Sequence, residues 1–249
     1  MRNLKLTLEY DGTNFAGWQF QPRQRTVQGE VTATLATLTG EKIAVFAAGR
    51  TDAGVHALGQ VASFHTASAL EPRVFMAALN SLLPDDVAVL AAAEAPEGWS
   101  AKRNACGKWY RYLIRDGGPR AALERHRVWR LPHRLDVEAM RAAAAPLIGE
   151  HDFSSFRSAT CEATSPVKEM RRIEIFRDGD GRVTMEFWAS AFLKQMVRAM
   201  VGTLAETGLR KRSAGDMPAV LAARDRRRAG ATAPAHGLYL LRVDYQEER

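Results

Sequence analysis

The chain has few of the residues that mark a secreted, disulfide-bonded or membrane-spanning protein. Its 249 residues include only two cysteines, Cys106 and Cys161, which lie far apart in the sequence. Neither a disulfide framework nor a CxxC metal site is indicated, and a reducing compartment is favoured. No apolar run approaches membrane-spanning length, and the first residues alternate like a strand instead of forming the apolar core of a signal peptide. We therefore expect a soluble, cytoplasmic protein.

The commonest catalytic signatures are absent as well. The sequence contains no GxxxxGKS or GxxxxGKT loop, no GxGxxG after the first strand, no HExxH, no GxSxG and no HxE with PCxxC. Its six histidines show no ligand spacing on a common face. These absences argue against the usual nucleotide-binding, zinc-protease, hydrolase and zinc-deaminase chemistries.

Positive charge is plentiful and unevenly distributed. The formal net charge is +7, yet residues 1–105 carry 9 Lys+Arg against 10 Asp+Glu, which leaves 26 against 18 for residues 106–249. The densest stretch, Arg120 to Arg134, has five arginines and two histidines, with Trp129 among them and only Glu124 opposing them. Such a stretch suits phosphate and base contacts, although a solvated charged face is the alternative.

The hydrophobic pattern predicts an α+β fold. Strands are expected over 4–10, 42–48, 60–66, 87–92, 108–115, 171–176, 183–188 and 238–245, and helices over 26–40, 72–83, 137–147 and 193–204. The repeated order suggests two similar RRM-like or ferredoxin-like α/β halves, with antiparallel sheets joined around a central cleft. We place an N-terminal half at 1–105 and a basic C-terminal half at 106–249.

One loop carries a pattern typical of a site. The run Gly49-Arg50-Thr51-Asp52-Ala53-Gly54-Val55-His56-Ala57 lies between two expected strands and combines an acid and a base with two glycines. Glycines permit backbone angles and close approaches that let Asp52 and Arg50 point together into a cleft. An aspartate in such a turn is also a common capping residue, so the local chemistry leaves both roles open.

Further blocks carry a resemblance to a known family. They are Tyr10 to Gln19, Gln21-Pro22, Thr26 to Gln28, the run at 49–57, Tyr110 to Tyr112, Asp152 to Phe156, Ala191 to Leu193, Met196 to Arg198, Val201-Gly202 and Gly237 to Leu240. In this order and spacing the chain strongly resembles the tRNA pseudouridine synthase A family over essentially its full length.

The resemblance implies an isomerase that converts uridine to pseudouridine at positions 38, 39 and 40, in the anticodon stem-loop of tRNA. It also implies a homodimer that works without a metal or cofactor. The reaction breaks the C1′–N1 glycosidic bond, turns the uracil over and rejoins it through C5.

The same resemblance assigns roles to five residues. Asp52 is the catalytic carboxylate, acting by attack at C6 or C1′ or through a glycal-like path, and Arg198 forms an ion pair with it. Tyr110 stacks on the flipped uracil or acts near its C5 proton, and Leu238 forms the apolar wall of the pocket. Arg50 helps to hold the target base out of the helix, where a cation can fill the vacated space.

Two other functions are kept as alternatives. The basic C-terminal half also fits a non-catalytic RNA-binding or tRNA chaperone module, although neither half contains an RNP1-like run. A carboxylate-dependent nucleosidase would use the same aspartate but release free uracil. A classical glycosidase pairs two carboxylates to admit water, and a single prominent carboxylate suits rearrangement better.

Overall fold

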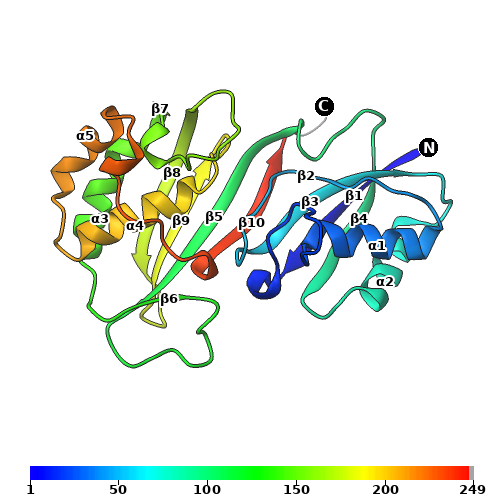
Figure 1. Ribbon diagram of the computed structural model, residues 1–249, viewed down its shortest axis with the longest axis horizontal. Coiled ribbons are helices and arrows are strands. Elements are labelled where there is room, and N and C mark those ends of the chain that lie inside the picture. The colour runs from blue at the N-terminus through cyan, green and yellow to red at the C-terminus, as the bar shows by residue number, and fades with distance from the viewer. Residues whose placement is uncertain (247–249) are drawn as a thin grey trace. The chain divides into compact units, whose positions relative to one another are not determined.

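The computed structural model describes residues 1–246 and divides into two compact units. Unit 1 contains Met1–Cys106 together with the C-terminal segment from Tyr239, and unit 2 contains Gly107–Leu238. Both combine helices with mostly antiparallel strands, so the predicted mixed α and β character is confirmed (Figure 1). Residues 247–249, the end of the predicted C-terminal half, lie outside the described residues.

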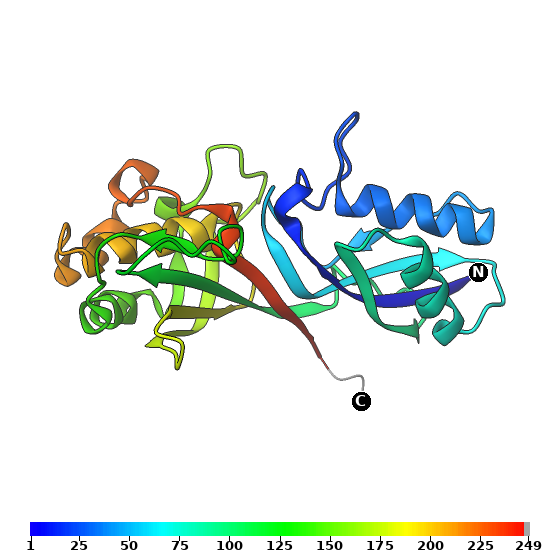
Figure 2. The same ribbon diagram turned by 90° about the horizontal axis from the view of Figure 1, so that it is seen from below.

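Unit 1 is built on a sheet with two helices. Its elements are β1 (Arg2–Tyr10), α1 (Val27–Thr39), β2 (Phe46–Ala47), β3 (His56–Thr66), α2 (Pro72–Leu82), β4 (Val87–Ala95) and β10 (Leu238–Tyr245). The strand order is β4-β1-β3-β10, and β2 pairs with β3. β1 runs antiparallel to β3 and β4, whereas β10 runs parallel to β3. The short 3-10 helix η1 (Gly12–Asn14) precedes a loop that leads to α1 and projects from the unit in Figure 2.

The sequence explains why β1 and α1 form where they do. Leu4, Leu6 and Leu8 alternate along β1 and are fully buried, as expected for a strand with one face on the core. At the start of α1 the Thr26 hydroxyl accepts a hydrogen bond from the Gly29 N–H at 3.2 Å, which makes Thr26 the predicted N-cap. The helix ends at Gly40, whose φ of 71° is the left-handed conformation favoured at a helix C-terminus.

Unit 2 has mostly antiparallel strands and three helices. Its elements are β5 (Ala105–Asp116), β6 (Trp129–Leu131), α3 (Val137–Ala144), β7 (Gly149–Asp152), β8 (Val167–Arg177), β9 (Val183–Ala189), α4 (Met196–Gly208) and α5 (Met217–Ala222). Short 3-10 helices lie at Ala145–Leu147, Ser154–Phe156, Ala214–Asp216, Arg226–Arg228 and Ala235–Gly237. The strand order is β5-β9-β8-β7, and β6 pairs with β5. Helix α3 packs against α4 and also contacts β8.

The structure corrects three of the expected elements. The strand expected over 42–48 is reduced to β2, because the Val45 carbonyl accepts the Gln28 side chain at 2.9 Å instead of a strand partner. The helix expected from residue 193 begins at Met196, because Gln195 adopts a left-handed φ of 63°. The helix expected over 137–147 becomes 3-10 after Ala144, where Pro146 lacks the N–H that an α-helix needs.

Within residues 1–246, no helix combines the length and the apolar character that crossing a membrane requires.

Candidate functional site

Asp52 lies in the loop that joins β2 to β3. The Asp52 carbonyl accepts a hydrogen bond from the Val55 N–H at 3.1 Å, and Gly54 adopts a φ of 77°, so the chain turns immediately after the carboxylate. The side chain of Asp52 is half-buried and that of Arg50 is exposed. Gly54 therefore forms the turn that the sequence predicts, in a backbone conformation that would be strained for other residue types.

A second segment holds this loop from one side. The Trp18 N–H donates to the Thr51 carbonyl at 3.0 Å, and the Gly54 N–H donates to the Phe15 carbonyl at 3.3 Å. Gly17 has a φ of 96°, and a Cβ at this position would lie 2.7 Å from the Thr51 carbonyl oxygen. Only glycine permits so close a contact, so the backbone around Asp52 is fixed by its neighbour and not by the turn alone.

Buried polar side chains hold the loop from inside the unit. The Tyr10 hydroxyl lies 2.8 Å from the Thr51 hydroxyl, and the Gln60 side-chain amide donates to the Gly49 carbonyl at 2.8 Å. Burial raises the pKa of Tyr10 to about 12, against the smaller opposing effect of its hydrogen bonds to Thr51 and Gln60. Tyr10 is therefore a neutral hydrogen-bonding support for the loop at ordinary pH.

This support predicts a specific pH dependence of stability. An unfolded tyrosine ionises near pH 10, whereas folded Tyr10 keeps its proton up to about pH 12, so the free energy of unfolding falls as the pH rises between these values. Tyr10→Phe cannot ionise, so the variant lacks this pH-dependent fall, which amounts to roughly 2 to 3 kcal/mol between pH 10 and pH 12 in wild type. We expect the variant to be less stable at about pH 9 and the gap from wild type to narrow by about pH 11 in denaturant unfolding. A gap that stays constant would contradict the assignment.

His56, at the first position of β3, was not assigned a role from the sequence. It is buried, and its Nδ1 accepts a hydrogen bond from the Gly12 N–H at 3.1 Å while lying 3.1 Å from an Asp11 carboxylate oxygen. Its ring stacks on Tyr239 with centroids 4.7 Å apart. A Cβ on Gly12 would lie 2.0 Å from the Val55 carbonyl oxygen, so this second glycine also packs directly on the loop. His56 therefore ties the turn after β1 to the end of the Asp52 loop.

In unit 2, two predicted residues lie around one tyrosine that was not singled out. Tyr110 and Tyr112 share a face of β5 because they are two residues apart on a strand. Tyr110 is buried, and its ring meets Phe192 edge-on with centroids 5.0 Å apart. Burial raises the pKa of Tyr112 well above its ordinary value, although the nearby positive charge of Arg198 acts in the opposite direction.

Arg198 is held by the segment that leads into β10. Its Nε donates to the Ala233 carbonyl at 2.8 Å, and the Ala233 N–H donates to the Arg198 carbonyl at 3.1 Å. The next residue, Pro234, accepts a 2.7 Å hydrogen bond from the Tyr112 hydroxyl. The Nε–H bond thus anchors the guanidinium of Arg198, and the backbone bond holds α4 to the same segment.

Leu238 belongs to the same neighbourhood. It is buried, and a Cβ on the preceding Gly237 would lie 2.7 Å from the Tyr112 ring. Within unit 2, Tyr110 shares a strand face with Tyr112, Arg198 lies near Tyr112, and Gly237, the neighbour of Leu238, packs on the Tyr112 ring. Within unit 1, Asp52 and Arg50 lie on one loop. The Tyr110-Arg111-Tyr112 block was the available signal for Tyr112, but only its first residue was assigned a role.

The basic stretch at 120–134 forms the connection into β6 and the residues after it. The five arginines in this stretch are exposed. Its one acid, Glu124, pairs with Arg115 at 2.8 Å and with Arg182 at 2.7 Å, both of which lie outside the stretch. Glu124 is therefore engaged elsewhere, and the arginines remain a surface of positive charge. The Trp129 ring contacts Tyr112 edge-on at 6.2 Å between centroids, so it packs inward from this surface.

Across residues 1–246, no group of three or more His, Cys, Asp or Glu side chains is placed to hold a metal ion.

Comparison with known proteins places these features in one family. The model of a family described as tRNA pseudouridine synthase matches residues 7–102 and 143–246. The tRNA pseudouridine synthase A of Geotalea uraniireducens is 45% identical over 245 residues, covering 98% of this chain and 100% of its own. That of Azorhizobium caulinodans is 46% identical over 249 residues, covering 100% of this chain and 96% of its own.

A more distant similarity is found among solved structures. A crystal structure of a Cbf5-Nop10-Gar1 complex matches with a TM-score of 0.39 and 11% identity, covering 97% of this chain and 59% of that chain. A similarity at this level carries no argument about function. The full-length identities and the match to the family model decide the classification: the chain belongs to the tRNA pseudouridine synthase A family.

Proposed function

We propose that this isomerase converts uridine to pseudouridine at positions 38, 39 and 40 in the anticodon stem-loop of tRNA. One observation carries the proposal: Asp52 is half-buried on a loop whose backbone is fixed by the segment at 11–18 and by buried polar side chains. A carboxylate held in this way is pre-organised, as catalysis by a positioned group requires. Family membership supplies the substrate class.

The chemistry needs a carboxylate and a protected pocket. The C1′–N1 bond breaks, the uracil turns within the pocket, a C1′–C5 bond forms, and the proton on C5 is replaced by one on N1, so the product is an isomer of the substrate. In our proposal Asp52 engages the sugar or the base while the bond is broken. Exclusion of water keeps the detached uracil from being lost to hydrolysis.

The remaining roles follow the family motifs. We propose that Arg198 pairs with Asp52 and orients the carboxylate, that Tyr110 stacks on the uracil and that Leu238 forms the apolar wall beside it. Arg50 holds the target base out of the helix. The anchoring of Arg198 by Ala233 supports its role, because an immobilised cation loses little entropy on pairing.

We also propose a domain organisation of two RRM-like halves joined around a central cleft. The half at 1–105 would carry the Asp52 loop, and the basic half at 106–249 would complete the active site and bind RNA. We further propose a cytoplasmic homodimer. The stacked Trp109 and Trp188 rings, 4.9 Å apart and only half-buried, support a protein interface on unit 2, since such aromatic surface is enriched at interfaces.

The test uses purified protein and unmodified tRNA labelled with tritium at C5 of uridine. Isomerisation releases tritium and leaves pseudouridine in an intact chain. A tRNA chaperone would release no tritium, and a nucleosidase would release free uracil and leave abasic sites. Either of these outcomes would overturn the proposal.

The exposed arginines at 120–134 give a prediction about binding. Arg120→Gln together with Arg125→Gln should reduce the magnitude of the slope of log affinity against log salt for tRNA by roughly one to two units, because each phosphate contact releases condensed counterions. The matched control, Lys42→Gln with Lys102→Gln, removes two exposed charges from near-neutral unit 1. Equal slopes for the two double variants would indicate a solvated charged face.

A further inference from the structure

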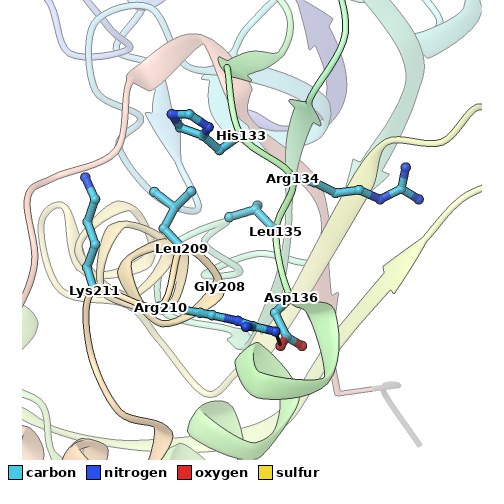
Figure 3. Close-up of a pocket in the computed structure, with 8 residues that line it drawn as sticks. All are labelled: His133, Arg134, Leu135, Asp136, Gly208, Leu209, Arg210 and Lys211. Carbon is cyan, nitrogen blue, oxygen red and sulfur yellow. Dashed lines mark hydrogen bonds and ion pairs between the residues drawn. The ribbon is translucent and has the colours of Figure 1, made fainter.

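A basic cavity lies in unit 2, at the C-terminal end of α4 and the start of α3. It has a volume of about 380 Å³. None of the residues assigned above to catalysis or uridine binding lines it, as Figure 3 shows. The side chains that matter for its chemistry are His133, Arg134, Leu135, Leu209, Arg210 and Lys211.

Most of the positive charge at this cavity is not committed to the protein. Among residues 1–246, the side chains of His133, Arg134 and Lys211 have no hydrogen-bond or ion-pair partner. This contrasts with Arg177 and Arg182 of the same unit, which are paired with carboxylates. Uncommitted cations gathered at one cavity are the electrostatic pattern of an anion site.

The one carboxylate at the cavity is already engaged. An oxygen of Asp136 accepts the Ala139 N–H at 3.1 Å as the N-cap of α3, and its other oxygen lies 3.5 Å from the Arg210 guanidinium. The negative charge of Asp136 therefore offsets the positive charge of Arg210, and the charges of Arg134 and Lys211 stay uncompensated.

The backbone beneath these side chains is rigid. The Asp136 N–H donates to the Gly208 carbonyl at 2.9 Å, and the Lys211 N–H donates to the Glu206 carbonyl at 2.9 Å. A Cβ on Gly208 would lie 2.7 Å from the Met140 sulfur and 3.0 Å from the Leu135 side chain, so the end of α4 packs directly on the segment that carries the other cations. The cavity is a fixed feature of the fold in which only the long cationic side chains need to move.

The shape of the cavity narrows the choice of anion. In Figure 3, His133 and Lys211 project to the same side with Leu209 between them, whereas Arg134 extends in the opposite direction. Cationic side chains that point in two directions, with apolar leucines between them, can contact successive phosphates along a nucleic-acid backbone. A single small anion would contact only the cations on one side. From this geometry we propose that the cavity binds the sugar-phosphate backbone of tRNA, away from the uridine that reacts. The inference rests on the proposed function.

The experiment measures tRNA binding at several salt concentrations with the full-length double variant Arg134→Gln, Lys211→Gln. We expect affinity to fall roughly tenfold near physiological salt and the magnitude of the salt slope to fall by about one to two units, as expected for two lost phosphate contacts. Both side chains are exposed, so the fold is not at risk.

The Lys42→Gln, Lys102→Gln variant serves again as the control for net charge. An unchanged slope, or an equal reduction in the control, would overturn the inference. Calorimetry with inorganic phosphate forms a second arm: binding that the double variant abolishes, together with an unchanged tRNA slope, would show a small-anion site instead. The proposed function is judged separately, because it fails only if wild-type protein forms no pseudouridine.

Discussion

Asp52→Asn should lower the single-turnover rate of pseudouridine formation by about 10³-fold or more while leaving tRNA affinity close to wild type. The amide has the shape of the carboxylate but neither its charge nor its basicity, so binding contacts survive and the bond-breaking step does not. The loop around position 52 is fixed by backbone hydrogen bonds from Trp18 and Gly54 that the substitution does not touch. The rate is measured by tritium release with enzyme in excess over tRNA.

A control variant at a second aspartate distinguishes the loss of the catalytic carboxylate from a general loss of negative charge. Asp85 is an exposed acid of the same unit, and Asp85→Asn should retain wild-type rate and affinity. If Asp52→Asn isomerised uridine as fast as Asp85→Asn does, catalysis by Asp52 would be excluded and an RNA-binding function favoured.

Gly17→Ala should reduce the isomerisation rate about 100-fold without removing the carboxylate. The new Cβ would lie 2.7 Å from the Thr51 carbonyl oxygen and 3.1 Å from the Asp52 carbonyl carbon, so the loop must move away from the segment at 11–18. Misplacing a catalytic group by about 1 Å can cost about 100-fold in rate. The measurement is the single-turnover rate, made at a temperature where thermal unfolding shows the variant to be folded.

Gly40→Ala is the control for backbone strain. Gly40 also has a positive φ, 71°, but a Cβ there would meet nothing within 4 Å, and it lies at the end of α1 away from the loop. It should lose about 1 kcal/mol of stability from the left-handed conformation and keep its activity. Equal activities for the two variants would mean that Gly17 contributes stability alone and that the loop tolerates displacement.

The sequence predicts a helix or strand correctly where its formation depends on residues close to one another in the chain. The leucine alternation of β1 and the caps of α1 at Thr26 and Gly40 are signals contained in a few consecutive positions, and the structure confirms both elements. Residues 42–45 carry an equally apolar pattern, yet they lie outside a strand because the distant Gln28 side chain binds the Val45 carbonyl. The short α5 was missed, since its six residues give little periodicity.

The residues of the candidate site likewise fall into those that the sequence predicts and those that it does not. Asp52 could be found because acid, base and glycines lie within one run of nine residues. The importance of Gly17, Gly12 and His56 could not be found, since each depends on a contact with residues far along the chain. The cavity in unit 2 shows the same limit: its two cationic segments are separated by most of unit 2 in the sequence.

The position of β10 has a consequence for how the protein is made. β10 pairs with β3 through Tyr239 opposite His56, and Val243 and Tyr245 pack on the core cluster that contains Val61 and Trp99. A nascent chain that has only emerged through unit 2 would still present β3 without this neighbouring strand, and an open strand edge invites wrong pairing. Unit 1 can therefore complete its sheet only after unit 2 has been synthesised, and the support of the Asp52 loop through His56 and Tyr239 has to wait for that step.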